Sequence, residues 1–158
     1  MDTENLFTDP RLTALGLLLE THAGLSAKLE PLLVEGGVSS LDLNALMRLS
    51  RSPDQRLRMS DLAAQTSLST SGITRLVDRL QRAGLVRRES FPGDRRSTYA
   101  VLTAEGADRV AQLLPDYLDT VERWYTGVLT PEQLQDFLAH LRVIRDHVHP
   151  GATAREGE

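Results

Sequence analysis

The sequence predicts a mainly α-helical fold with one small β-hairpin, and three observations support this. Apolar residues recur every three or four positions over most of the 158 residues, which is the period of amphipathic helices. Only residues 85–102 change period, with two runs of strand-forming residues on either side of a Pro-Gly pair. The chain is 41% hydrophobic but only 4% aromatic, which favours aliphatic packing between helices.

The first predicted helix runs from Pro10 to the glycine pair at 36–37. Pro31 is expected to kink or end it, since proline removes a backbone donor. A second helix, from about 40 to 49, can begin at a Ser39 or Ser40 cap, and residues 51–54 are typical of a loop. The leucines of the first helix keep helical spacing: Leu12, Leu15, Leu18, Leu19, Leu25, Leu29, Leu32 and Leu33.

The middle of the chain predicts a short helix at 60–66, a tight turn at 67–69, and a longer helix at 70–83. Ser69 is the expected N-cap of the longer helix, and Gly84 its C-terminal stop. One face of this helix is apolar and fixes its buried side: Ile73, Leu76, Val77 and Leu80. The opposite face is polar: Thr70, Ser71, Thr74, Arg75, Asp78 and Arg79.

Residues 85–90 and 98–102 are predicted to pair as two strands, with Pro92-Gly93 in a type II turn. A long helix then follows from a Thr103 cap to slightly past Gly127, and Pro115 is expected to bend or split it. Thr130, Pro131 and Glu132 begin a last helix that reaches Val148. We expect residues 150–158 to form a disordered tail.

The formal net charge of -4 conceals a basic segment. Residues 51–100 hold ten Arg and five acidic residues, a net charge of +5, whereas the rest of the chain carries -9. Short helix, turn, longer helix and basic hairpin, in this order, are typical of a winged helix-turn-helix. The longer helix of that fold fits the major groove of DNA with its exposed row of side chains. The sequence therefore predicts binding to double-stranded DNA.

The predicted DNA-contacting residues of the longer helix are Ser69, Thr70, Ser71, Thr74, Arg75 and Arg79. Ser71, Thr74 and Arg75 lie near its N-terminus and are candidates for contacts with bases, while Arg79 and Arg82 are expected to reach phosphates. The hairpin tip adds Asp94, Arg95 and Arg96, of which Asp94 is expected to orient an arginine. The alternative is an ordinary solvated surface, with Asp78 paired to Arg75 or Arg82.

Five segments together resemble the MarR family of bacterial transcriptional regulators: Leu62-Ala63, the run from Ile73 to Leu80, Gly84-Leu85-Val86, Asp94-Arg95-Arg96 and Leu102-Thr103-Ala104-Glu105-Gly106. The resemblance implies a homodimer in which residues 10–37 and 103–149 form a helical dimerisation domain and residues 38–102 form the winged lobe. It also implies that Arg96 enters the minor groove of a pseudo-palindromic operator. A monomeric core is the alternative for the apolar stripes of the terminal helices.

Members of the family often respond to small aromatic acids or phenols, so the resemblance implies a repressor relieved by such an effector. His22, Asn44 and Met47 are candidate pocket residues, although a satisfied buried histidine is the simpler explanation for His22. A winged-helix module for protein interaction or DNA architecture, without a specific operator, remains the alternative function.

Other classes of function have little support in the sequence. Without cysteine the chain has no disulfide, thiolate metal site or thiol nucleophile. A small hydrolase is disfavoured because the sequence has no Gly-x-Ser-x-Gly or phosphate loop, and its histidines lie away from the Ser-rich turn. His140, His147 and His149, at spacings of seven and two, give no compact set of metal ligands, so surface histidines are the simpler explanation. We therefore expect a cytoplasmic protein, with no membrane contact, that is not an enzyme and has no cofactor or metal.

Overall fold

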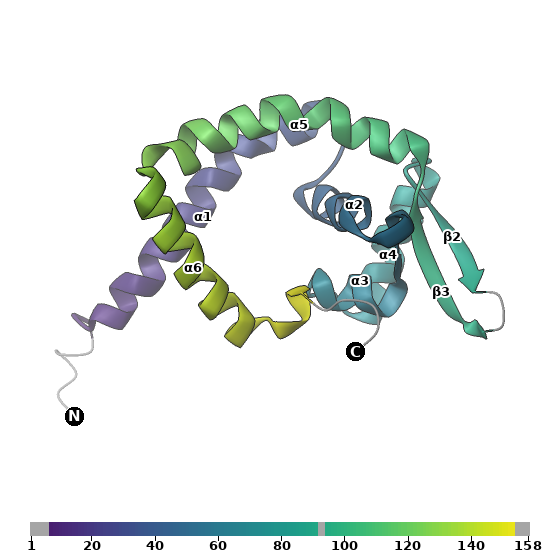
Figure 1. Cartoon of the computed structure of the whole chain (residues 1–158), viewed down its shortest axis with the longest axis horizontal. Coiled ribbons are helices and arrows are strands. Elements are labelled where there is room, and N and C mark those ends of the chain that lie inside the picture. The colour runs from purple at the N-terminus through teal and green to yellow at the C-terminus, as the bar shows by residue number, and fades with distance from the viewer. Residues whose placement is uncertain (1–6, 92–93, 154–158) are drawn as a thin grey trace.

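The computed structural model describes residues 7–91 and 94–153, with the side chains of residues 91 and 94–96 outside that description. The described chain curves into an open ring (Figure 1). Helices α1 (Pro10–Glu35), α5 (Ala104–Trp124) and α6 (Pro131–Val148) form one side of it. The other side is a lobe built from α2 (Ser40–Arg51), α3 (Met59–Gln65), α4 (Thr70–Arg82) and a small antiparallel sheet. The predicted mainly α fold with a winged helix-turn-helix lobe is confirmed.

The lobe encloses most of the hydrophobic core. Ile73, Leu76, Val77 and Leu80, the predicted apolar face of α4, are all buried. They pack with fully buried leucines of α2 and α3 and with residues at the ends of the strands: Leu46, Leu49, Leu62, Leu85, Val86 and Leu102. Ser39 caps α2 and Ser69 caps α4, each accepting a backbone hydrogen bond from three residues further on.

The sheet has three strands, where the sequence predicted two. Strands β2 (Val86–Phe91) and β3 (Asp94–Leu102) form the expected hairpin, and β1 (Arg56–Arg58) pairs antiparallel with the other edge of β3. Sequence pattern missed β1 because it has three residues, two of them arginines, and only Leu57 is buried. It forms because β3 offers a free edge of backbone groups beside the core. The predicted turn at Pro92-Gly93 lies outside the described residues.

The two prolines inside the terminal helices neither end nor split them. Helix α1 continues through Pro31 to Glu35, and α5 continues through Pro115 to Trp124. Both prolines are exposed, so water can solvate the backbone carbonyl that each leaves without a donor. Helix α6 begins as predicted, with Thr130 and Gln133 in a reciprocal capping box.

The chain does not become a loose tail at Pro150. Residues Pro150–Thr153 form a 3-10 turn that returns to the lobe and packs against α3. His149 lies 2.9 Å, through Nε2, from the backbone oxygen of Ala64 and from the hydroxyl of Ser67. The imidazole of His149 and the close packing of Gly151 on Ala64 thus hold this turn against the lobe, so the predicted tail does not begin at residue 150. Residues 154–158 lie outside the described part of the chain.

Within the described ranges, no helix combines the length and apolar composition needed to cross a bilayer.

Candidate nucleic-acid interface

Helix α4 presents a polar face beside its buried one. Ser69, Thr70, Ser71, Thr74 and Arg75 are all exposed. Ser69 Oγ accepts from the amide of Gly72 at 3.1 Å and lies 3.2 Å from Ser71 Oγ, while Thr74 donates to the carbonyl of Thr70. Arg75 has no hydrogen-bond or ion-pair partner among the described residues, so its guanidinium is available to an external acceptor.

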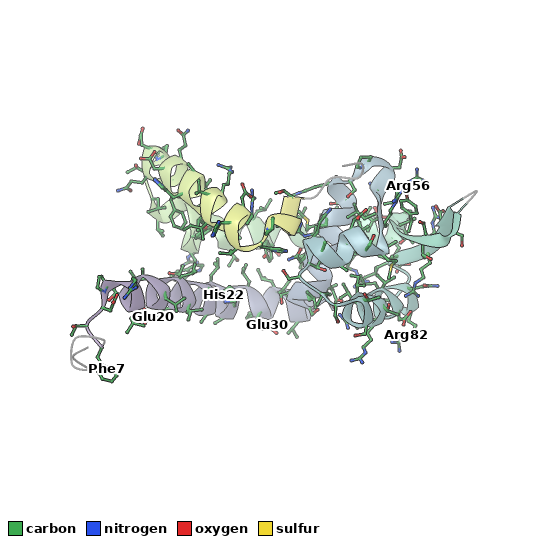
Figure 2. All side chains as sticks on the ribbon, turned by 90° about the horizontal axis from the view of Figure 1, so that it is seen from below. Phe7, Glu20, His22, Glu30, Arg56 and Arg82 are labelled. Atoms are coloured by element: carbon green, nitrogen blue, oxygen red, sulfur yellow. The ribbon has the colours of Figure 1, made fainter. Side chains whose placement is uncertain are left out.

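The two charged residues that follow on α4 are both paired. Asp78 Oδ1 accepts from Arg88 Nη1 of β2 at 2.5 Å, which ties α4 to the hairpin. The alternative of a pair with Arg75 or Arg82 is wrong: among the described residues Arg75 has no partner, and Arg82 donates to the backbone oxygen of Asp78 instead of its carboxylate. Arg79, predicted to reach a phosphate, donates through Nε and Nη2 to Asp42 of α2. Figure 2 shows Arg82 pointing outward at the edge of the lobe.

Asp42 is a buried carboxylate with its lone pairs occupied. Oδ2 accepts from the amide and the hydroxyl of Ser39, and Oδ1 accepts from Arg79. Burial acts to raise the pKa of Asp42, but the hydrogen bonds from Arg79 and Ser39, together with the charge of Arg79, outweigh burial and hold this pKa below its ordinary value. Asp42 is therefore an ionised anchor for Arg79.

The backbone of Asp94, Arg95 and Arg96 belongs to β3, but their side chains lie outside the described residues. The predicted roles of these three residues therefore stay predictions. At the far edge of the same sheet, Arg56 and Arg58 of β1 stack against the ring of Tyr99 at 5.3 and 5.9 Å. Sequence analysis did not single out these two arginines because it missed β1.

The three predicted pocket residues all line one open cleft of about 1310 Å³ between the terminal helices and the lobe. His22 is exposed and lies on the side of α1 facing α6 (Figure 2), so a buried histidine is the wrong description. Asn44 accepts from Arg48 Nε at 2.8 Å, and Met47 is half-buried. The cleft brings these residues together from α1 and α2.

Three arginines that the sequence did not single out also line the cleft: Arg48, Arg51 and Arg145. Burial, and then the charges of Arg51 and Arg145, lower the pKa of Arg48. Arg48 Nη1 donates to the carbonyl of Ala152 at 2.8 Å, so the C-terminal turn forms part of the wall. Burial raises the pKa of Tyr117, whose ring lines the same space. The residues come from four segments, which explains why no local pattern revealed the cluster.

The terminal helices expose large apolar side chains. Helix α1 buries only Leu29 and Leu33, and α6 buries none of its 18 residues. The exposed set spans all three helices: Leu12, Leu15, Leu18 and Leu19 on α1, Leu118 and Trp124 on α5, and Phe137, Val143, Ile144 and Val148 on α6. So many exposed large apolar side chains are more typical of an interaction surface than of a solvated one.

Comparison with known proteins gives a consistent result. A model of the MarR family matches residues 36–97. The HTH-type transcriptional repressor YetL of Bacillus subtilis is 34% identical over 116 residues, which are 70% of this chain and 70% of the relative. The crystal structure of AbsC, a MarR family transcriptional regulator from Streptomyces coelicolor, is 34% identical and superposes with a TM-score of 0.83, over 90% of this chain and 96% of that one.

Sco3205, a MarR family transcriptional regulator from the same organism whose structure is in complex with DNA, is 30% identical with a TM-score of 0.81. That similarity covers 88% of each chain. The winged lobe, its arrangement with the terminal helices and the similarity over most of the length agree. The chain therefore belongs to the MarR family of transcriptional regulators.

Proposed function

We propose that this protein is a homodimeric, sequence-specific DNA-binding regulator that represses transcription and is released by a small ligand. The observation that carries the proposal is the polar face of α4. This face presents Ser71, Thr74 and Arg75 to solvent, and Arg75 has no partner in the part of the chain that the structure describes. An arginine in the major groove can contact guanine through two hydrogen bonds. The relatives YetL, a named repressor, and Sco3205, crystallised with DNA, support this function.

A second copy of the chain is the proposed partner of the exposed apolar faces. In the proposed division, residues 10–37 and 103–149 form the dimerisation domain and residues 38–102 the lobe. A two-fold axis between the terminal helices would give two lobes related by symmetry, as a pseudo-palindromic site requires. Their α4 helices would then enter major grooves one helical turn apart, about 34–36 Å.

The remaining DNA contacts follow from the position of the elements. Ser69 and Thr70 lie at the N-terminus of α4, where free amides and the helix dipole attract a phosphate. Arg82 lies at the other end of the helix and is proposed to contact the backbone. Arg95 and Arg96 of the hairpin are proposed to reach the minor groove, with Asp94 orienting one of them.

The cleft is the proposed effector site, and its composition favours an anion with an apolar body. Arg48, Arg51 and Arg145 supply positive charge, whereas Leu25, Leu29 and Leu114 supply apolar wall. A phenolic acid has both properties, because its carboxylate can pair with a guanidinium while its ring packs on leucines. Such a ligand would lie between dimerisation helices and lobe, where it can change the spacing of the two lobes.

The test is footprinting on the DNA upstream of the protein's own gene, with and without hydroxybenzoic acids. We expect protection of a two-fold symmetric sequence that is lost in Arg75→Ala and relieved by a ligand of this class. Gln135→Ala, on an exposed position of α6, is the matched control and should protect as the wild type does. Uniform weak protection, unchanged by Arg75→Ala, would instead favour an architectural or protein-interaction module.

A further inference from the structure

We propose that Arg79 is a positioning residue, which fixes the angle of α4 against α2 through Asp42, rather than a contact to DNA. This inference rests on the proposed function of α4 in DNA binding. It assigns different roles to arginines that share one side of the same helix: Arg75 and Arg82 face outward, and Arg79 holds the helix in place.

The geometry of the pair carries the first step. Arg79 donates through Nε at 3.1 Å and Nη2 at 2.5 Å to the same oxygen of Asp42. The side chain of Asp42 is 9% exposed, whereas that of Arg79 is 50% exposed. If a phosphate drew Arg79 away, the buried carboxylate would lose its only cationic partner among the described residues. Such a loss is costly for a buried charge, so the pair is expected to persist on DNA.

The second step is the connection of Asp42 to the rest of the molecule. Asp42 also closes the capping box with Ser39, so Arg79 is anchored at the first turn of α2. This turn begins three residues after Gly37, and the carbonyl of Gly36 accepts from Arg109 of α5 at 3.0 Å. The backbone of residues 36–42, with these hydrogen bonds at its two ends, thus connects a terminal helix to α4.

The third step is that α4 is held on both sides. Asp78, the preceding residue, pairs with Arg88 of β2, while Arg79 pairs with Asp42 of α2. Successive residues on a helix point in directions about 100° apart. The two ion pairs therefore fix the rotation of α4 about its own axis, and this rotation decides which of its side chains face the groove.

The experiment measures DNA affinity as a function of salt for Arg79→Gln, Asp42→Asn and the double variant. The probe is a duplex that the wild-type protein selects from a random-sequence pool. Arg82→Gln, three residues further along α4, is the matched control. Failure of the wild type to select any duplex contradicts the proposed function itself, which separates that result from failure of the present inference.

A positioning role predicts that each single variant weakens binding about tenfold, roughly 1.4 kcal/mol, and that the double variant is no weaker than either single one. It also predicts an unchanged slope of log affinity against log salt, because Arg79 releases no counterion. Arg82→Gln should instead lower the slope by about 0.9, the value for one phosphate contact. A reduced slope in Arg79→Gln, with wild-type or tighter binding by Asp42→Asn, would overturn the inference. Wild-type affinity in both single variants, per folded molecule, would also overturn it.

Discussion

The lobe and the terminal helices use their apolar residues differently. Helix α4 buries four of its 13 residues, and these complete a core within one chain. Helix α1 has 26 residues and buries two, and α6 buries none of its 18. Amphipathic helices gain stability mainly by burying their apolar face. Within a single chain, the described residues leave most of the apolar faces of α1 and α6 uncovered. The core of the lobe is therefore complete in one chain, whereas the apolar faces of the terminal helices stay exposed in it.

The largest effect is expected inside the lobe. Leu46 is fully buried, so Leu46→Ala should lower the free energy of unfolding by about 2–5 kcal/mol through lost burial and a cavity. Urea denaturation at one fixed protein concentration measures this. Leu12→Ala is the matched change on an exposed site of α1, with a much smaller expected effect on the lobe. Equal losses in both variants would contradict the difference between the regions.

A charge on the open face of α6 should break the assembly rather than the lobe. Ile144 is 53% exposed in the single chain, and Ile144→Glu should weaken self-association by roughly 100-fold, about 2.7 kcal/mol. Gln135→Glu, nine residues earlier and so about half a turn away on the helix, should leave association unchanged. Sedimentation over a range of concentrations distinguishes the two variants. Unaltered association in Ile144→Glu would show that this face is not the interface.

Two glycines, one packed against the lobe and one on exposed α1, test the same difference between the two regions. A Cβ on Gly106, where α5 meets the lobe, would lie 2.1 Å from the carbonyl oxygen of Leu85, whereas a Cβ on Gly24 of α1 meets nothing within 4 Å. Gly106→Ala should therefore destabilise by about 1–3 kcal/mol through overpacking. Gly24→Ala should stabilise by about 0.5–1 kcal/mol, the difference in helix propensity. Thermal denaturation tests both, and a stabilised Gly106→Ala would refute the close packing at this junction.

The smallest expected effect is the pH dependence of the Asp42 anchor. Its folded-state pKa lies below its unfolded value, so ionised Asp42 stabilises the fold at neutral pH. This contribution is lost as the pH falls through the folded-state pKa. We expect about 1 kcal/mol, since Arg79 is half exposed and partly screened. The free energy of unfolding of Asp42→Asn, measured from neutral pH into the acid range, should fall less steeply than that of the wild type. Parallel curves would contradict the assignment.

Local pattern predicted most of the fold. The apolar spacing of α4, its Ser69 cap and the capping start of α6 depend on neighbours in sequence, and the structure shows each of them. Strand β1 was missed because its pairing with β3 joins residues more than 40 positions apart. The 3-10 turn at 150–153 was missed for the same reason, since its partner is α3.

The sequence predicted which candidate side chains share a helix face, but not which residues they pair with. Helical spacing placed Thr74 and Arg75 on one exposed face. The predicted pocket residues, His22 of α1 with Asn44 and Met47 of α2, line one cleft. Helical spacing could not show that Arg79 pairs with Asp42, 37 positions away, because an ion pair between α4 and α2 depends on tertiary packing. The arginine cluster of the cleft likewise joins α2 to α6 and has no local signature.

The mass of the full-length protein in solution tests most directly whether the terminal helices need a second copy. Sedimentation equilibrium at micromolar concentration and moderate salt should give twice the 17.5 kDa of one chain. Its dissociation into single chains should occur only on dilution or in Ile144→Glu. A mass of 17.5 kDa at every concentration would show that the exposed leucines of α1 and α6 have no copy of this chain to cover them.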